Sequence, residues 1–78
     1  MSLHKVSNFS IGQTGYIVQI NSVIRHQLLE MGLTRGAKIT LIRKAPLGDP
    51  LEIEVRGYRL SIRKSEAETI ITGNEEDG

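Results

Sequence analysis

Five short stretches of the chain have the composition of strands, and in most of them apolar and polar residues alternate, which is typical of strands with one buried face. The stretch 51–56 alternates without a break. The stretch 58–62 follows it after Gly57, so the two predict a hairpin with a tight turn. The other three stretches are 15–20, 37–43 and 69–72. In the first of these, the alternation places Tyr16, Val18 and Ile20 on one face.

A different period appears in residues 23–31, where apolar residues fall at helical spacing. The apolar face of this predicted helix is formed by Ile24, Leu28 and Met31. Asn21-Ser22 precede it as a capping pair, and Gly32 follows where helices commonly end in a left-handed residue. Such a short helix is not stable alone, so we expect it to pack on the sheet.

The remaining segments predict connections and ends. Residues 1–13 predict an arm and a turn, and 64–68 predict one helical turn capped by Ser65. The segment 73–78 holds only Gly, Asn and acidic residues, which predicts a disordered acidic tail. We therefore expect one domain over 1–72. Short strands with regular turn signals predict a mainly β fold, a small barrel of about five strands with a short helix inserted after the first.

Chain length and amino-acid composition limit the classes of protein to which this sequence can belong. With 78 residues the chain is long enough for one domain. It has no cysteine, which excludes a disulfide or a thiolate metal site. No segment approaches the roughly 18 apolar residues that a membrane helix needs, and no apolar signal segment follows the polar start. We expect a cytoplasmic protein that does not insert into the membrane.

The net charge of +1 hides an uneven distribution along the chain. All ten basic residues lie between Lys5 and Lys64, and five of the nine acidic residues follow Lys64. Residues 1–65 therefore carry ten positive and four negative charges, net +6. Such a body could attract an acidic partner or nucleic acid. The basic residues are also interleaved with apolar ones, as on ordinary solvated strands, and both interpretations stay open here.

Three runs, taken in this order and spacing, resemble the FeoA family of small cytosolic proteins of bacterial ferrous-iron uptake. They are Leu28-Leu29-Glu30-Met31-Gly32-Leu33-Thr34-Arg35-Gly36, Ala45-Pro46-Leu47-Gly48-Asp49-Pro50 and Val55-Arg56-Gly57-Tyr58-Arg59-Leu60-Ser61-Ile62-Arg63. The similarity covers roughly residues 7 to 72. The same domain resembles the carboxy-terminal domain of iron-dependent repressors of the diphtheria-toxin-repressor type.

The resemblance implies both a fold and a role. The implied fold is an SH3-like β-barrel with a helix inserted after the first strand. The implied role is support of a FeoB-type ferrous-iron permease, whose cytosolic part is a GTP-binding domain and would be the partner. The resemblance implies no catalytic site and no cofactor. The alternative role is that of an iron-responsive or nucleic-acid-associated regulatory domain, as in the repressors.

The surface expected to bind the partner combines a loop and a helix face. Loops on a rigid scaffold often carry function, and loop 45–50 has an apolar residue at its tip. The candidate residues are Leu47, Gly48 and Asp49 in the loop, with Arg25, Gln27 and Glu30 on the helix. Leu47 could instead fold back over the mouth of the barrel.

Enzymatic, metal and nucleic-acid sites are weakly supported. The chain has no Gly-x-x-x-x-Gly-Lys-Ser/Thr run and no arguable Ser-His-Asp or Cys-His set, so we predict that it is not an enzyme. His26 and Glu30 share a helix face as two metal ligands would, but a ferrous site usually needs more. A basic face is conceivable from Arg43, Lys44, Arg56, Arg59, Arg63 and Lys64. The chain has few aromatic residues, and we expect Tyr16 and Tyr58 to be buried. It therefore offers few exposed rings on which nucleic-acid bases could stack.

Overall fold

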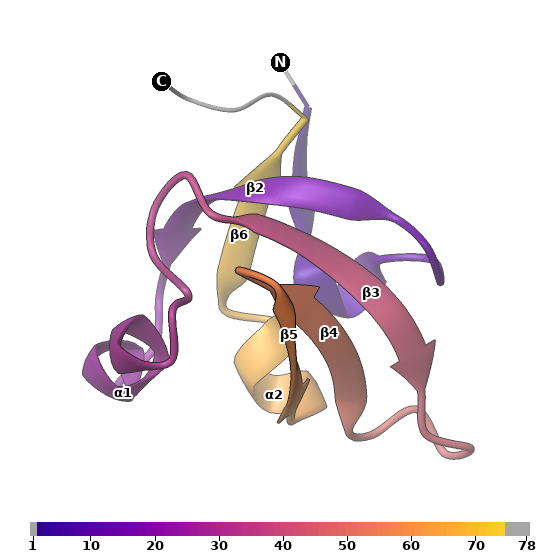
Figure 1. The fold of residues 1–78 in the computed structure, drawn as a ribbon. Coiled ribbons are helices and arrows are strands. Elements are labelled where there is room, and N and C mark those ends of the chain that lie inside the picture. Colours follow the sequence, from indigo (N-terminus) through magenta and orange to yellow (C-terminus); the bar gives the residue numbers. More distant parts are fainter. Residues whose placement is uncertain (1, 75–78) are drawn as a thin grey trace.

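The alternating stretches form one antiparallel sheet in the computed structural model, which describes residues 2–74. The strands are β1 (Leu3–Lys5), β2 (Thr14–Ile20), β3 (Lys38–Lys44), β4 (Leu51–Val55), β5 (Tyr58–Ile62) and β6 (Ile70–Gly73). The helices are a 3₁₀ turn η1 (Val6–Asn8), α1 (Arg25–Glu30) and α2 (Lys64–Ala67). The strand order is β1-β6-β2-β3-β4-β5. Figure 1 shows α1 on the side of β2 and α2 below β6.

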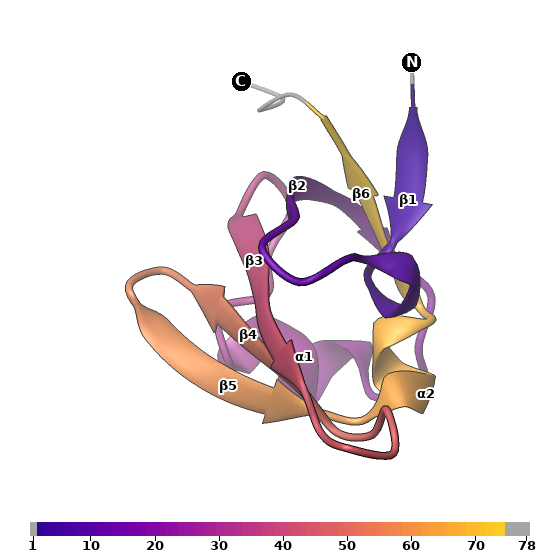
Figure 2. The same ribbon diagram turned by 90° about the vertical axis from the view of Figure 1, so that its right-hand side faces the viewer.

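The sheet curls around a single apolar core. Figure 2 shows β4 and β5 on one side of the curl and β1 and β6 on the other. The largest fully buried side chains are Phe9, Ile17, Leu28, Leu33, Ile39, Leu41, Leu51, Ile53, Ile62 and Ile70. They come from all strands except β1, from α1 and from the loops, so the predicted mainly β fold with one inserted helix is confirmed.

The predicted arm at the start of the chain contains a sixth strand. Residues 3–5 pair with β6 in the register Leu3↔Gly73, His4↔Thr72 and Lys5↔Ile71. Their three side chains are exposed, so this strand has no apolar alternation by which a sequence pattern could reveal it. Phe9 then anchors the arm in the core, where it is 1% exposed.

The buried face of β2 differs from the predicted one. Gly15, Ile17 and Ile20 are buried, whereas Tyr16 and Val18 are half-buried. A β-bulge between Ile17 and Gln19 explains the difference. The extra residue shifts the alternation by one position, so that Ile17 and Ile20 both face the core.

The helical segments are shorter than predicted. The segment 23–31 forms α1 only over Arg25–Glu30, and Val23 is fully exposed. Gly32 ends it as expected, with a φ of 95° and a bond from the Leu33 N–H to the Leu28 carbonyl. In α2 the capping residue is Arg63, whose N–H donates to Oε1 of Glu66 at 2.8 Å. The predicted Ser65 cap is therefore wrong.

The predicted tail begins at Gly73, which the structure places at the end of β6. Gly73 is buried and pairs with Tyr16 of β2 as well as with Leu3. Asn74 is exposed. The remaining residues of the predicted disordered tail, 75–78, lie outside the described residues.

Candidate functional site

Loop 45–50 is an ordered turn that presents one apolar side chain. The Ala45 N–H donates to the Pro50 carbonyl at 3.0 Å, and the Gly48 N–H donates to the Ala45 carbonyl at 2.7 Å. At the tip, Leu47 is 95% exposed. The alternative in which Leu47 folds back over the barrel is therefore wrong.

Asp49 has a structural contact in this loop. Its Oδ1 accepts a hydrogen bond from the Lys64 N–H at 2.9 Å, at the start of α2. A carboxylate that accepts from a backbone N–H at a helix start stabilises that end. The carboxylate thus fixes the loop against α2, while the Leu47 side chain stays exposed at the tip.

The three helix candidates do not share one face. Arg25 and Leu29 are four residues apart and lie on the same side of α1, and both line a hollow against β2. Gln27 and Glu30 are exposed and fall on other sides of the helix. Figure 1 shows α1 and the loop between β3 and β4 on opposite sides of the molecule. The predicted surface is thus divided into two separate regions.

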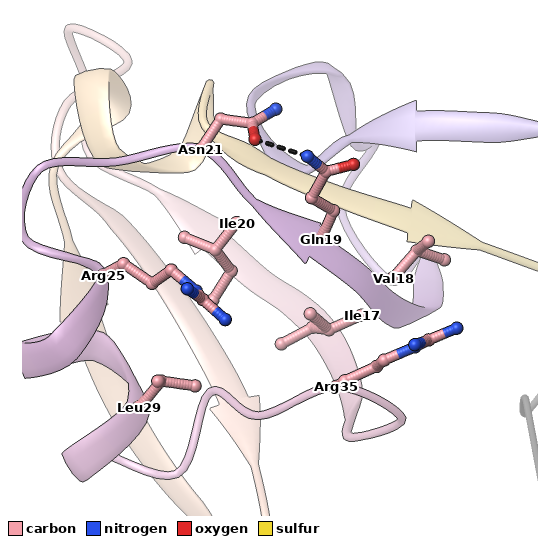
Figure 3. A pocket seen from close by; sticks show the side chains of 8 residues that line it. All are labelled: Ile17, Val18, Gln19, Ile20, Asn21, Arg25, Leu29 and Arg35. Atoms are coloured by element: carbon pink, nitrogen blue, oxygen red, sulfur yellow. Dashed lines mark hydrogen bonds between the residues drawn. The ribbon is translucent and has the colours of Figure 1, made fainter.

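The region at α1 includes a groove between β2 and α1, which we call the β2–α1 groove. It has a volume of about 390 Å³. Its lining residues are Ile17, Val18, Gln19, Ile20, Asn21, Arg25, Leu29 and Arg35. Figure 3 shows Arg25 reaching from α1 beside Ile20, while Arg35 lies at the other end, near Ile17, with its guanidinium directed outward.

Among the described residues that line the groove, Arg25 and Arg35 carry the charges. Between them, Nε2 of Gln19 donates to Oδ1 of Asn21 at 2.6 Å, so these amides have remaining donors and acceptors for a bound segment. The sequence-based prediction included Arg25 but missed Arg35, because ten residues and a turn separate the two.

Two hollows next to loop 45–50 have mixed charge. One, of about 390 Å³, is lined by Asp49, Pro50, Ser61, Ile62, Arg63 and Glu66. The other, of about 250 Å³, includes both Arg43 and Glu52. Since each holds cations and carboxylates together, neither favours a ligand of one charge.

The basic residues of the central strands face acidic ones. Nε of Arg43 lies 3.9 Å from Oε1 of Glu52, and Glu54 is directly opposite Arg59 in the register of β4 and β5. The predicted basic face is thus interrupted by a row of glutamates on β4, and Arg56 is turned toward Gly32 and Thr34.

The two weak metal-ligand candidates lie on the surface of α1. His26 and Glu30 are both exposed. Among residues 2–74, no three His, Cys, Asp or Glu side chains come together as a metal site would require. Every buried side-chain polar atom in this part of the chain has a hydrogen-bond partner. None of the helices described is long and apolar enough to cross a membrane.

Sequence comparisons with known proteins agree on one family. The FeoA domain model matches residues 4–72. The chain is 34% identical over 68 residues to a fusion protein of Fe(2+) transport protein A and Fe(2+) transporter FeoB from Porphyromonas gingivalis. That match covers 85% of this chain and 8% of the relative, so the chain spans less than a tenth of that protein's length.

Solved structures agree with the sequence matches. A FeoA-like protein from Clostridium acetobutylicum has a TM-score of 0.87 at 32% identity, over 100% of this chain and 93% of that one. FeoA of Stenotrophomonas maltophilia, in complex with zinc, has a TM-score of 0.74 at 25% identity over 86% of each chain. It is described as a prokaryotic SH3 domain protein and a candidate activating factor of ferrous iron transport.

The resemblance to metal-dependent repressors is confirmed at the level of the fold. A manganese-dependent transcriptional repressor superposes with a TM-score of 0.84 over 94% of this chain and 42% of its own. The identity is 9%.

Proposed function

This chain belongs to the FeoA family, and on that basis we propose that it is a binding module that acts with a FeoB-type ferrous-iron permease through the permease's cytosolic GTP-binding domain. The module would regulate or tether that domain without catalysing a reaction. Its place in the cell would then be the cytoplasmic side of the membrane.

The observation that carries this proposal is the fusion in Porphyromonas gingivalis. There, a segment 34% identical to this chain is part of a single protein with the FeoB transporter. Fusion keeps two domains at a high effective concentration, which is useful when the separate domains act together. The Stenotrophomonas protein, described as a candidate transport activating factor, is in line with this role.

The surface chemistry of the chain also favours a protein partner. Leu47 is 95% exposed at a loop tip, where a partner could bury it for a gain of about 1.5–3 kcal/mol. Helix α1, which borders the β2–α1 groove, adds a second region on another side of the molecule (Figure 1). A site assembled for acid–base or metal chemistry would need converging side chains, and His26 with Glu30 are only two exposed residues on one short helix.

The test is an amide NMR titration of the ¹⁵N-labelled protein. Three separate additions are made: the cytosolic domain of the FeoB-type permease of the same organism, a short DNA duplex, and ferrous iron without oxygen. We expect localised shifts with the permease domain. Shifts along β3, β4 and β5 with DNA, together with silence toward the permease domain, would contradict the proposal and favour a role like that of the repressors.

A matched pair of variants tests whether loop 45–50 is part of the interface. Leu47→Asp should weaken binding of the permease domain if the loop contacts it, while Ile11→Asp, at another exposed apolar residue, should not. If Leu47→Asp leaves the affinity unchanged in a folded protein, loop 45–50 is not part of the interface.

A further inference from the structure

We propose that β5 pairs with β5 of a second copy of this chain, antiparallel and centred on Leu60, so that the two sheets join across a two-fold axis. This self-association does not depend on the proposed role with the permease, because it involves only the edge of the sheet that β5 forms.

The outer edge of β5 is open. The strand order ends at β5, whose only neighbour among the described residues is β4. Figure 2 shows no other element of the described chain beyond β5 on that side. The backbone hydrogen bonds made by loops and caps include none to residues 58–62. A row of backbone donors and acceptors is thus left for another strand.

The turn of the β4–β5 hairpin determines which backbone groups point outward. Its two central residues, Arg56 and Gly57, have positive φ, as in a type I′ turn, and the residues that flank such a turn are hydrogen-bonded to each other. Bonded and non-bonded pairs then alternate along the ladder, whose register has no shift. Residues 58, 60 and 62 therefore bond to β4, whereas the N–H and C=O groups of Arg59 and Ser61 point to the open edge.

Pairing centred on Leu60 matches these groups between two copies. Arg59 then lies opposite Ser61 of the second copy, and each such pair can exchange both backbone hydrogen bonds. The two Leu60 residues face each other as a non-bonded pair, in which opposite side chains are closest. Leu60 is half-buried and packs against the core, so the pairing covers apolar surface that one domain leaves open.

The charges on the outer face of the hairpin also select a second copy. In the register of β4 and β5, Glu54 lies opposite Arg59 and Glu52 lies opposite Ser61. Across the paired edge the order is therefore Glu54 and Arg59, followed by Ser61 and Glu52 of the second copy. Each arginine thus has carboxylates on both sides, and no like charges are directly opposite within the paired strands.

The reach from Arg59 to the carboxylate of the second copy is short enough for an ion pair. Two strand spacings separate their backbones by about 10 Å, and the serine between them is small. Glu52 also lies 3.9 Å from Nε of Arg43 in its own chain, but a carboxylate can accept from several donors. The two-fold axis makes this contact twice.

The other edge of the sheet is less suited to such pairing. β1 has three residues, and all of their side chains are exposed, so it is short and has no apolar row to cover. β5 has five residues. Bulges, prolines and inward-pointing charges protect strand edges against pairing, and β5 contains none of them.

Sedimentation equilibrium of the unmodified protein is the first test. A contact between two single strands is small, and interfaces below about 1,200 Å² are typical of weak complexes. We therefore expect a monomer–dimer equilibrium with a Kd of about 10 μM to 1 mM, and dilution over that range should shift the amide NMR signals of residues 59–61. A monomer at every concentration, or dilution shifts confined to other strands or loops, would overturn the proposal.

A proline variant tests the backbone pairing itself. Ser61→Pro removes an N–H that points to the open edge, where proline is tolerated in a folded domain, and we expect it to raise the Kd of the dimer about tenfold or more. Ser61→Ala keeps the N–H and is the matched control, which should dimerise like the unmodified protein. Equal effects of the two variants would show that this backbone group is not in the interface.

A charge variant provides a second, independent readout. R59E places a glutamate between Glu54 and Glu52 of the second copy, so we expect the dimer to weaken about tenfold. The control K5E makes the same change in net charge at an exposed residue of β1 and should alter the Kd by less than about threefold. Equal weakening by R59E and K5E would contradict the proposed pairing. Urea unfolding of each variant checks that the fold is intact.

Self-pairing and the proposed function can fail separately. If the protein stays monomeric while the permease domain shifts the amides of residues 59–61, the open edge binds the permease, self-pairing is wrong and the proposed function stands. If the protein dimerises through β5 and the permease domain does not bind, self-pairing stands and the proposed function is wrong.

Discussion

At the scale of single residues, Gly15 of β2 packs closely against Thr72 of β6. A β-carbon built on Gly15 would lie 2.6 Å from Oγ1 and 2.8 Å from Cβ of Thr72, and 3.0 Å from Cζ of Phe9. Thr72 is itself 1% exposed, and its hydroxyl donates to the His4 carbonyl at 3.0 Å. Because Gly15 has no side chain, Thr72 can pack directly on β2. The Thr72 hydroxyl at the same time bonds to β1.

Gly15→Ala should lower the free energy of unfolding by about 1–3 kcal/mol, because the added methyl group overpacks a rigid contact. Gly73→Ala is the control, since its β-carbon would meet only Cγ2 of Val18 at 3.4 Å. Urea unfolding followed by circular dichroism measures both. Equal losses in the two variants would contradict this account of Gly15.

Thr72→Val should destabilise the fold by about 1 kcal/mol, because the His4 carbonyl loses its hydroxyl donor. The effect should be local: the substitution should accelerate amide hydrogen exchange more in β1 and β6 than in β4. Thr40→Val serves as the comparison, because the Thr40 hydroxyl bonds to Thr14 at an exposed position. If exchange in β1 is unchanged by Thr72→Val, this hydroxyl does not hold the strand.

Individual residues also show where sequence-based prediction succeeded and where it failed. Gly32 and Gly57 were placed at chain reversals, and both have positive φ values in the structure. Tyr58 was expected to be buried, but it is 42% exposed. Its alternation with Leu60 and Ile62 is real, yet the strand lies at the edge of the sheet and its first residue extends past the core.

At the scale of elements, the β4–β5 hairpin is fixed by its tip. Arg56 and Gly57 form a two-residue turn in which both φ values are positive, at 51° and 84°, as in a type I′ hairpin. The left-handed conformation disfavours arginine. Two hydrogen bonds at the tip offset this conformational cost. Nε of Arg56 donates to the Gly32 carbonyl at 3.1 Å, and the Tyr58 hydroxyl donates to the Met31 carbonyl. The hairpin is thereby bound to the end of α1.

Tyr58→Phe should reduce the free energy of unfolding by about 1 kcal/mol, since it removes the hydroxyl that the Met31 carbonyl accepts from. Tyr16→Phe, at the half-buried tyrosine of β2, is the comparison and should cost less. Thermal and urea unfolding give both values. A smaller loss for Tyr58→Phe than for Tyr16→Phe would show that the hairpin tip is not fixed by this bond.

The elements that sequence patterns missed have a common physical reason. β1 has three exposed side chains, and its pairing depends on the β6 backbone and on Thr72, which lie about seventy positions away. The bulge in β2 interrupts alternation within a single strand. By contrast, β4 alternates over its whole length with buried Leu51, Ile53 and Val55, and it was predicted correctly.

At the scale of the whole molecule, the surface divides into regions of different chemistry. Loop 45–50 and α1, whose residues Arg25 and Leu29 line the β2–α1 groove, lie on opposite sides (Figure 1). Sequence reasoning placed Leu47 and Arg25 among the candidate residues but joined them in one surface, since spacing along the chain does not give distance in space. It also could not join Arg25 with Arg35, which the reversal after α1 brings to one groove.

The charge distribution predicts weak interaction with nucleic acid. Glutamates on β4 lie beside Arg43 and Arg59, so the sheet does not offer a continuous row of cations for phosphates. At near-physiological ionic strength we expect no retention of a short DNA duplex in a gel-shift assay. Salt-sensitive retention that charge reversal at Arg59 and Arg63 abolishes would contradict this.

The most direct test of the binding function is calorimetric titration of this protein into the purified full-length FeoB-type permease of the same organism, in lipid nanodiscs. We predict saturable binding that Leu47→Asp weakens and that Ile11→Asp, at another exposed apolar residue, does not. The absence of saturable heat with a permease shown to bind guanine nucleotide, confirmed by failure of the two proteins to co-elute, would contradict the proposed role.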